Sequence, residues 1–204
     1  MRTQQVAVWV AMGMSAAMLA GCHVESDKHG DSDNVKISTP FGGMQVKTND
    51  AVVVEDIGLP AYPGAQLVKK DKDNGSADVN MNFGSFHLRV KAASFRTDDS
   101  PDKVEAFYRN GMKRYGDVIA CRDDQVVGTP ARTFEGLTCE NQKEGHIMVQ
   151  DNPSKHKLEL KAGSQQHQHI VEINADGDGT KFGLVALDLP GKMTTDSEND
   201  DTRQ

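Results

Sequence analysis

The sequence predicts an α+β fold, with an antiparallel sheet, one main helix at about residues 100–115 packed on one face of it, and one disulfide. Most of the chain divides into short segments in which apolar and polar residues alternate, as where Glu159 separates Leu158 from Leu160. This alternation is typical of antiparallel strands with one buried face. Only one stretch of the chain beyond residue 22 has the apolar spacing of a helix, and short polar turns separate the other segments. Many strands with one helix indicate the α+β class.

The helical stretch has signals at both of its ends. Ser100 is a typical N-cap residue, and Pro101 suits the first helical position. Gly116 is placed to end the helix. Gly111 lies within it, where glycine costs about 1 kcal/mol against alanine, so we expect a close approach to the sheet there. The buried face is expected to consist of residues at helical spacing, which are Val104, Phe107, Tyr108, Met112 and Tyr115.

Strands are expected on both sides of this helix. The segment 57–65 contains two prolines and two glycines, so Leu59 and Tyr62 are expected to cover the core from outside regular structure. The glycines and aspartates of 174–180 predict a hairpin turn. The expected strands are two short ones within 35–48, then 66–70, 77–83, 86–95, 117–122, 132–140, 146–150, 157–162, 168–174 and 180–189.

The N-terminus resembles a bacterial lipoprotein signal. Arg2 precedes an apolar run from Val6 to Leu19, which is too short to span a bilayer comfortably. Leu19-Ala20-Gly21-Cys22 then resembles the lipobox, in which the cysteine is lipidated and becomes the first residue of the mature chain. By the same resemblance His23, rather than aspartate, favours the outer membrane. The alternatives are an ordinary secretory signal and a membrane anchor.

Charge and composition suggest the limits of the folded part. We expect a signal peptide at 1–21, an acidic flexible tether at 22–35, a single α+β domain at 36–190 and a disordered acidic tail at 191–204. The net charge of -7 argues against nucleic acid or an anionic membrane surface as the main partner. Membrane attachment is therefore expected to depend on the lipid.

Two cysteines remain if Cys22 is lipidated. Cys121 and Cys139 are expected to form a disulfide, because an exported chain with an even pair favours one. The closed loop would contribute about 3 kcal/mol in the chain-entropy model. A catalytic thiol and a metal thiolate are the alternatives, but no CxxC motif supports them.

Several segments resemble metal sites only in part. The loop at 174–179 has oxygen side chains where an EF-hand loop has them, but Lys181 and Val185 occupy positions that calcium loops fill otherwise. The carboxylates of 71–76 lack the bidentate glutamate. His167 and His169 would lie on one side of a strand and could share a metal with His146 or His156. We expect no metal and no cofactor.

Catalytic motifs are absent from the sequence, which has no HExxH, no GxSxG and no phosphate-binding loop. We therefore expect no catalytic residues. We expect the tyrosines to belong to the core and the histidines to lie on an exposed strand. The alternative is a surface site formed by Tyr62, Tyr108, His167 and His169.

Two segments resemble a recurrent module of bacterial envelope lipoproteins of unassigned activity. Leu59-Pro-Ala-Tyr-Pro-Gly-Ala65 matches its YPGA strand, and the segment from Thr97 to Tyr108 matches its DSPEKVxxFY helix. The resemblance implies a fold but no activity. We expect an outer-membrane lipoprotein that faces the periplasm and acts as a non-catalytic binding or structural module. A periplasmic hydrolase with carboxylate or histidine chemistry and an accessory subunit of an envelope complex, with a protein partner, are the alternatives.

Overall fold

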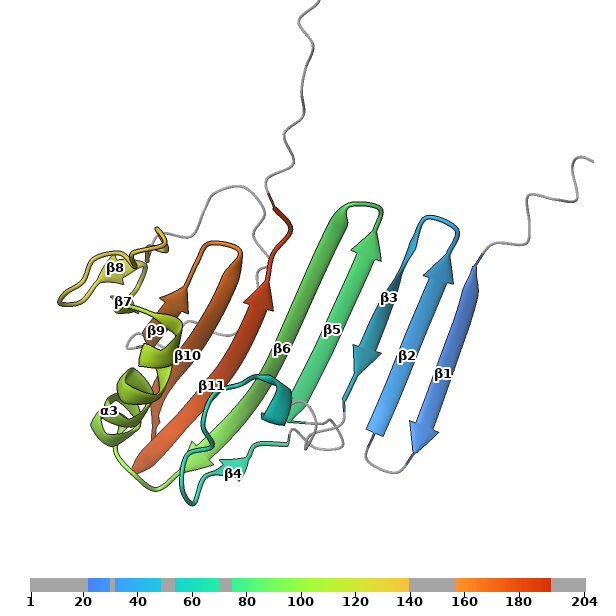
Figure 1. Cartoon of the computed structure of the whole chain (residues 1–204). Coiled ribbons are helices and arrows are strands. Elements are labelled where there is room, and N and C mark those ends of the chain that lie inside the picture. Colours follow the sequence, from blue (N-terminus) through green and yellow to red (C-terminus); the bar gives the residue numbers. More distant parts are fainter. Residues whose placement is uncertain (1–21, 30–31, 49–53, 70–74, 140–156, 192–204) are drawn as a thin grey trace, which may run out of the picture.

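The structure, a computed structural model, describes residues 22–29, 32–48, 54–69, 75–139 and 157–191. It confirms the predicted class, since a mostly antiparallel sheet of 11 strands carries one main helix (Figure 1). The helix is α3, Pro101–Met112, and the 3₁₀ turn η1, Lys113–Tyr115, extends it. The strands are β1 His23–His29, β2 Ser32–Thr39, β3 Gly42–Lys47, β4 Gln66–Leu67, β5 Ser76–Phe83, β6 Phe86–Thr97, β7 Val118–Arg122, β8 Gln125–Val126, β9 Leu158–Gly163, β10 His167–Asp176 and β11 Gly179–Asp188.

The sheet has one continuous strand order, β1-β2-β3-β5-β6-β11-β10-β9-β7-β8, and β4 pairs with β6 off this path. Hairpins make most of the neighbours, but β6 and β11 are far apart in the sequence and pair along nine residues, from Thr97 with Thr180 to Arg89 with Asp188. This pairing joins the N-terminal and C-terminal parts of the chain into one sheet.

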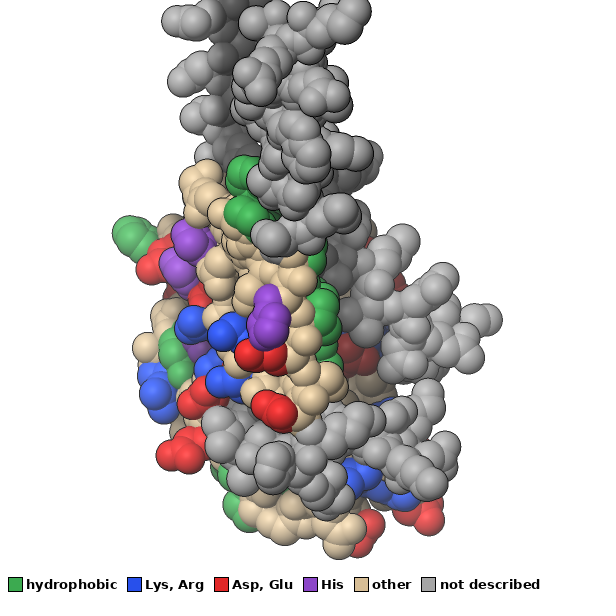
Figure 2. Space-filling view, turned by 90° about the vertical axis from the view of Figure 1, so that its right-hand side faces the viewer, with side chains coloured by type: hydrophobic (Ala, Val, Ile, Leu, Met, Phe, Trp, Pro, Cys, Tyr) green, Lys and Arg blue, Asp and Glu red, His purple; other side chains and the backbone are tan. Residues whose placement is uncertain are grey.

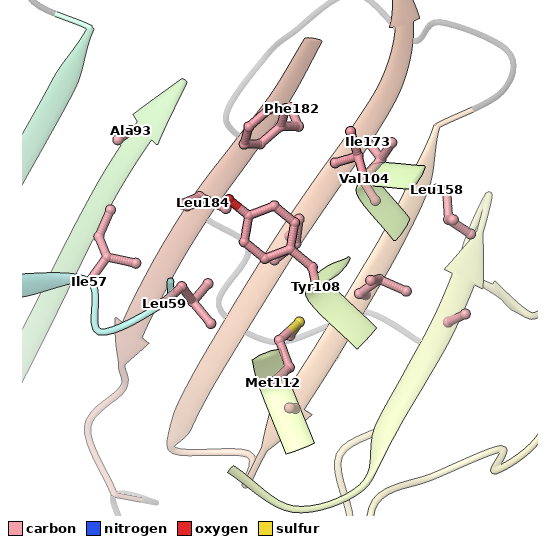
Figure 3. Packing of buried hydrophobic residues seen from close by; sticks show 14 residues of the cluster. Ile57, Leu59, Ala93, Val104, Tyr108, Met112, Leu158, Ile173, Phe182 and Leu184 are labelled. Atoms are coloured by element: carbon pink, nitrogen blue, oxygen red, sulfur yellow. The ribbon is translucent and has the colours of Figure 1, made fainter. Parts of the chain in front are cut away.

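The core lies between α3 and the strands β9, β10 and β11 (Figure 3). Val104, Tyr108 and Met112 are the buried residues of α3. They face apolar residues at alternate positions of the three strands, as the period of two requires. These strand residues are Leu158, Leu160, Ala162, Val171, Ile173, Phe182 and Leu184.

The segment before β4 covers the edge of this core, as predicted. Ile57 and Leu59 are buried, and Tyr62 packs edge-on against Phe107 with ring centroids 5.0 Å apart. The predicted close approach of Gly111 is real, but its partner differs from the expectation. A Cβ on Gly111 would lie 2.7 Å from Cγ of Pro60, so the glycine makes room for this segment rather than for the sheet.

The helix begins and ends where the sequence predicts. Ser100 is the N-cap residue, although its side chain makes no capping hydrogen bond. Gly116 ends the 3₁₀ turn at φ 105°, a backbone conformation that favours glycine, and its N–H donates to the carbonyl oxygen of Lys113.

The disulfide between Cys121 and Cys139 is present, with Cα atoms 5.4 Å apart. It joins β7 to an irregular segment. The strand that the sequence predicts at 132–140 is therefore wrong. Only isolated bridges occur there, between Arg132 and Thr138 and between Gly136 and Ser164. Together with Ile119 and Leu137, the two cysteines form a second, smaller buried cluster. The predicted strand at 146–150 lies outside the described residues.

The expected tether at 22–35 is also wrong for most of its length. β1 pairs with β2 in a regular antiparallel register, in which Val24 lies opposite Ile37 and Glu25 opposite Lys36. Among the described residues, regular structure therefore begins at His23, directly after Cys22. The tail at 192–204 lies outside the described residues.

Helix α3 covers only the C-terminal part of the sheet. On the helix side, β1 to β6 carry mostly polar and charged residues at alternate positions, while the reverse side of the same strands carries apolar ones, such as Val46, Val79 and Val90. Figure 2, which looks onto the β1 side of the molecule, shows histidine, basic and acidic side chains gathered to the left of a strip of hydrophobic ones, with further side chains of both kinds elsewhere in the view. The candidate site lies on the helix-side face of β3, β5 and β6, which α3 does not cover.

Candidate functional site

A small hollow of about 210 Å³ lies on the helix side of the sheet, over β3, β5 and β6. Its lining is entirely polar or charged. The lining residues are Gln45, Lys47, Asp56, Asp78, Asn80, Arg89 and Lys91. This hollow is smaller than the pockets of drug-sized ligands, which measure about 300 Å³ or more. It can hold one small polar molecule or one unit of a longer chain.

The register of three strands brings six of these residues together. Asp78 of β5 lies opposite Lys47 of β3 on one side and opposite Lys91 of β6 on the other. Two residues along the strands, Asn80 lies between Gln45 and Arg89 in the same way. Because residues two apart share one face of a strand, the two rows form a compact patch.

Asp56 enters the hollow from a different part of the chain. Residues 54–56 form a short helical turn before the Pro-Gly segment. The ammonium nitrogen of Lys91 donates to Oδ2 of Asp56 at 2.7 Å, and the Lys91 side chain is only 13% exposed. This ion pair links the helical turn at 54–56 to β6, and both of its residues line the hollow.

The electrostatics of the hollow favour an ionised Asp56. The hydrogen bond and the charge of Lys91 lower the pKa of Asp56, and Lys47 and Arg89 add smaller contributions in the same direction. Three cations and two carboxylates line the hollow, so its lining carries a net positive charge.

Several polar groups in the hollow are available to a ligand. Oδ1 of Asp78 is buried and has no hydrogen-bond partner within the described part of the chain. The side chains of Lys47 and Arg89 likewise form no hydrogen bond or ion pair with another described residue, although the charges of both act on Asp56. A buried acceptor without a partner is costly, and the carboxylate of Asp78 lines the hollow, where a ligand hydroxyl could approach it. The hollow thus offers two cations and one acceptor close together.

A second, more open hollow of about 590 Å³ lies beside the end of α3. Arg109, Lys113 and Asp117 line it together with the apolar residues Val118, Pro130 and Phe134. The Phe134 side chain is 93% exposed, and the backbone N–H of Phe134 donates to Oδ2 of Asp117 at 3.0 Å. This hollow offers fewer converging polar groups than the first.

The proposed surface site at Tyr62, Tyr108, His167 and His169 is not present as one site. Tyr108 is fully buried, which contradicts a surface role. Burial raises the pKa of the Tyr108 phenol well above its usual range, and its hydroxyl has no hydrogen-bond partner among the described residues. Tyr62 is half-buried, and its hydroxyl donates to Oδ2 of Asp99 at 2.9 Å. Both tyrosines belong to the core and its edge.

The two histidines lie on the helix side of β10 but have separate partners. His167 is exposed and lies 2.9 Å from Oδ1 of Asp188. The ring of His169 stacks on Tyr115 with centroids 3.5 Å apart. Burial lowers the pKa of His169, and the charge of Arg114 acts in the same direction, while Asp188 raises it. Neither histidine is directed at the polar hollow.

The metal-like segments do not assemble a site within the described residues, where no group of three potential metal ligands occurs. The segment 174–180 is the predicted hairpin turn, with Asp176 opposite Gly179 and Gly177 at φ 61°. The carboxylate of Asp176 lies 3.4 Å from Nε of Arg96. His146, His156 and residues 71–74 lie outside the described residues.

Sequence reasoning missed the polar hollow, although a signal for it exists. Three strands each carry two polar residues at alternate positions, which are Gln45 with Lys47, Asp78 with Asn80, and Arg89 with Lys91. The strand order that places these pairs side by side could not be obtained from the sequence.

Comparison of the chain with protein families, with curated proteins and with solved structures gives no match. Within the described residues, no helix is long and apolar enough to cross a membrane.

Proposed function

We propose that this chain is a lipid-anchored protein of the bacterial cell envelope that acts as a non-catalytic binding module. Cys22 would carry the lipid, hold the protein at the outer membrane and leave the domain facing the periplasm. The binding role is supported by the polar hollow over β3, β5 and β6. In it, the side chains of Lys47 and Arg89 have no ion-pair partner among the described residues. The sequence resemblance to envelope lipoproteins supports the anchor.

The chemistry of the hollow favours a small hydroxylated anion as the ligand. Lys47 and Arg89 can hold a carboxylate or phosphate group through charge-assisted hydrogen bonds. The carboxylate of Asp78 can accept a hydrogen bond from a ligand hydroxyl, and the amides of Gln45 and Asn80 can donate and accept. A sugar acid combines these features, alone or as one unit of an acidic polysaccharide.

Hydrolysis is supported less well, although Asp56 and Asp78 line the same hollow. A carboxylate pair that cleaves glycosidic bonds needs one member protonated as the general acid. The lowered pKa keeps Asp56 ionised, and Lys91 occupies its Oδ2. Asp56 is therefore unsuited to donate a proton. A role as an accessory subunit remains compatible with a binding module and would add a protein partner.

The test is a titration of the isotope-labelled mature chain, with Cys22→Ser for solubility, followed by nuclear magnetic resonance. Glucuronate is the anionic probe and glucose its neutral counterpart. Glucuronate should shift the backbone amides of residues 45–47, 78–80 and 89–91, and glucose should shift them much less. The double variant Lys47→Gln, Arg89→Gln should lose the response by tenfold or more in affinity.

The control is Lys181→Gln, which removes an exposed positive charge on the reverse side of β11. It should bind glucuronate as the wild type does. An equal loss in both variants would show a general charge effect, and equal shifts with glucose would show that the anion is not recognised. Turnover of a sugar-acid ester or glycoside by the wild-type chain would contradict the non-catalytic role.

A further inference from the structure

One end of the sheet gathers exposed apolar side chains around Cys22. His23 lies opposite Ser38 in the register of β1 and β2, so Cys22 stands level with Thr39. Thr39 lies opposite Gly42, and Gly42 lies opposite Phe83. The first residue of the proposed mature chain therefore shares one end of the sheet with the turns β2–β3 and β5–β6 (Figure 1). We call this end the Cys22 end.

Three of the large exposed apolar residues of the described chain lie at the Cys22 end. Phe41 in the β2–β3 turn is 84% exposed, Val24 of β1 is 61% exposed and Phe83 at the end of β5 is 40% exposed. Single exposed apolar residues are common, so what distinguishes these three is that they lie at the same end of the sheet as Cys22.

The exposed position of Phe41 is held by the backbone around it. The Thr39 hydroxyl donates to the carbonyl oxygen of Gly42 at 2.8 Å across the turn. The N–H of Gly84 donates to the carbonyl oxygen of Phe41 at 3.3 Å, so the two turns are joined. A side chain on Gly42 would collide with Asn82 and Phe83, so glycine is required for this approach. Phe41 therefore projects from a supported turn.

The polar groups at this end suit contact with lipid headgroups. His23 lies 3.0 Å from a carboxylate oxygen of Glu25, and His87 lies 2.6 Å from the amide oxygen of Asn82. Ser38 and Gly43 occupy the row between them. A surface with apolar tips and polar residues behind them is typical of proteins that lie at the membrane interface.

We propose that Val24, Phe41 and Phe83 contact the bilayer that holds the acyl chains of Cys22. The proposal rests on the lipidation stated under the proposed function, which selects a lipid surface as the occupant. Because β1 begins directly after Cys22, the described structure has no intervening tether residue between the lipidated residue and the sheet. Insertion of the acyl chains would bring the Cys22 end to the membrane surface.

This contact would orient the molecule. The strands would run away from the membrane, and Arg89 and Lys91 lie three and five residues along β6 from Phe86. At about 3.3 Å per residue, the polar hollow would open roughly 10–17 Å from the Cys22 end. The site would then face along the membrane surface, within reach of molecules attached to it.

The test uses tryptophan fluorescence, because the only tryptophan of the chain, Trp9, precedes Cys22 and is absent from the proposed mature protein. The variant Phe41→Trp is purified from membranes, its Cys22 lipid is verified by mass, and it is reconstituted into phosphatidylethanolamine–phosphatidylglycerol vesicles that contain acyl-brominated lipid. The control Asp178→Trp places the fluorophore in the exposed β10–β11 turn at the opposite end of the sheet, roughly 35 Å away along the strands.

Emission of Phe41→Trp should shift to the blue, and brominated lipid should quench at least half of it, while emission of Asp178→Trp stays unquenched. Equal quenching of the two variants, or none in either while the protein stays on the vesicles, would overturn the proposal. If Cys22 carries no lipid, the anchor in the proposed function fails. The same pair of lipid-free variants added to vesicles then decides the membrane contact, since quenching only at position 41 supports it and none refutes it.

Discussion

Tyr62 donates its hydroxyl to Oδ2 of Asp99 at 2.9 Å. This hydrogen bond joins the segment before β4 to the residues that lead into α3, because Tyr62 belongs to the first and Asp99 precedes the N-cap residue Ser100. The ring of Tyr62 also packs on Phe107 and on Phe182 of β11, with centroids 5.0 and 5.8 Å apart. The two segments therefore form one packing unit with β11.

Substitutions at Tyr62 should separate packing from hydrogen bonding. Tyr62→Phe keeps the ring and should lower the free energy of unfolding only slightly, because Asp99 still has Lys103 as a partner at 2.7 Å. Tyr62→Ala removes the ring and should cost roughly 2 kcal/mol or more. Urea denaturation of both variants measures the difference. Equal losses would show that the hydrogen bond, not the packing, dominates.

Gly111 should resist substitution in spite of its helical position. Gly111→Ala gains about 1 kcal/mol of helix propensity. Its Cβ would however lie 2.7 Å from Cγ of Pro60, so we expect a net loss of stability. The double variant Gly111→Ala, Pro60→Ala should regain part of this loss in a thermal unfolding experiment. A more stable single variant would show that the Pro60 segment moves away freely.

The disulfide should stabilise the irregular segment before residue 140. Cys121→Ala, Cys139→Ala should lower the free energy of unfolding by about 3 kcal/mol, since the bridge closes a loop with a sequence separation of 18. Because Cys139 is buried beside Leu137, hydrogen exchange should rise first in the segment 132–139. Unchanged stability in the variant would mean that packing alone holds this segment.

Much of the fold follows from local signals in the sequence. The helix has both of its end signals and a regular apolar face, and the 174–180 turn has its glycines and aspartates, so both were predictable. β1 was not, because Glu25 and Asp27 are typical of a solvated segment. β1 forms because it pairs with β2, in spite of its polar composition. That β2 would be its neighbour could not be inferred from the local sequence pattern.

The candidate site shows the same limit. Alternate polar residues on three strands are visible in the sequence, but their meeting depends on the order β3-β5-β6 and on Asp56 arriving from outside the sheet. For Tyr108 the sequence suggests a surface site that is not there. An aromatic residue at helical spacing fits a core and a binding surface equally well. Only packing against Phe182, with centroids 5.5 Å apart, decides for the core.

Stability should depend on pH through His169. Its folded pKa is lowered from the ordinary 6.5 by burial against Tyr115, so the unfolded chain binds the proton more readily. Stability from this group is therefore complete above about pH 6.5 and is lost as the pH falls toward the folded pKa. His169→Phe keeps a stacked ring that cannot be protonated. The melting temperature of this variant should therefore change less with pH between pH 7 and about 5. His87→Gln, at an exposed position, should leave the slope as it is; an unchanged slope in His169→Phe would remove His169 as the cause.

The proposed anchoring, the orientation at the membrane and the access to the polar hollow all follow from the state of Cys22. The direct measurement is the mass of the N-terminal peptide of the full chain, expressed in bacteria and purified from the membrane fraction. We predict a peptide that begins at Cys22 and carries diacylglycerol on its sulfur, and an unprocessed precursor for Cys22→Ala. A chain that begins at another residue, or a Cys22 peptide without lipid, would contradict the account.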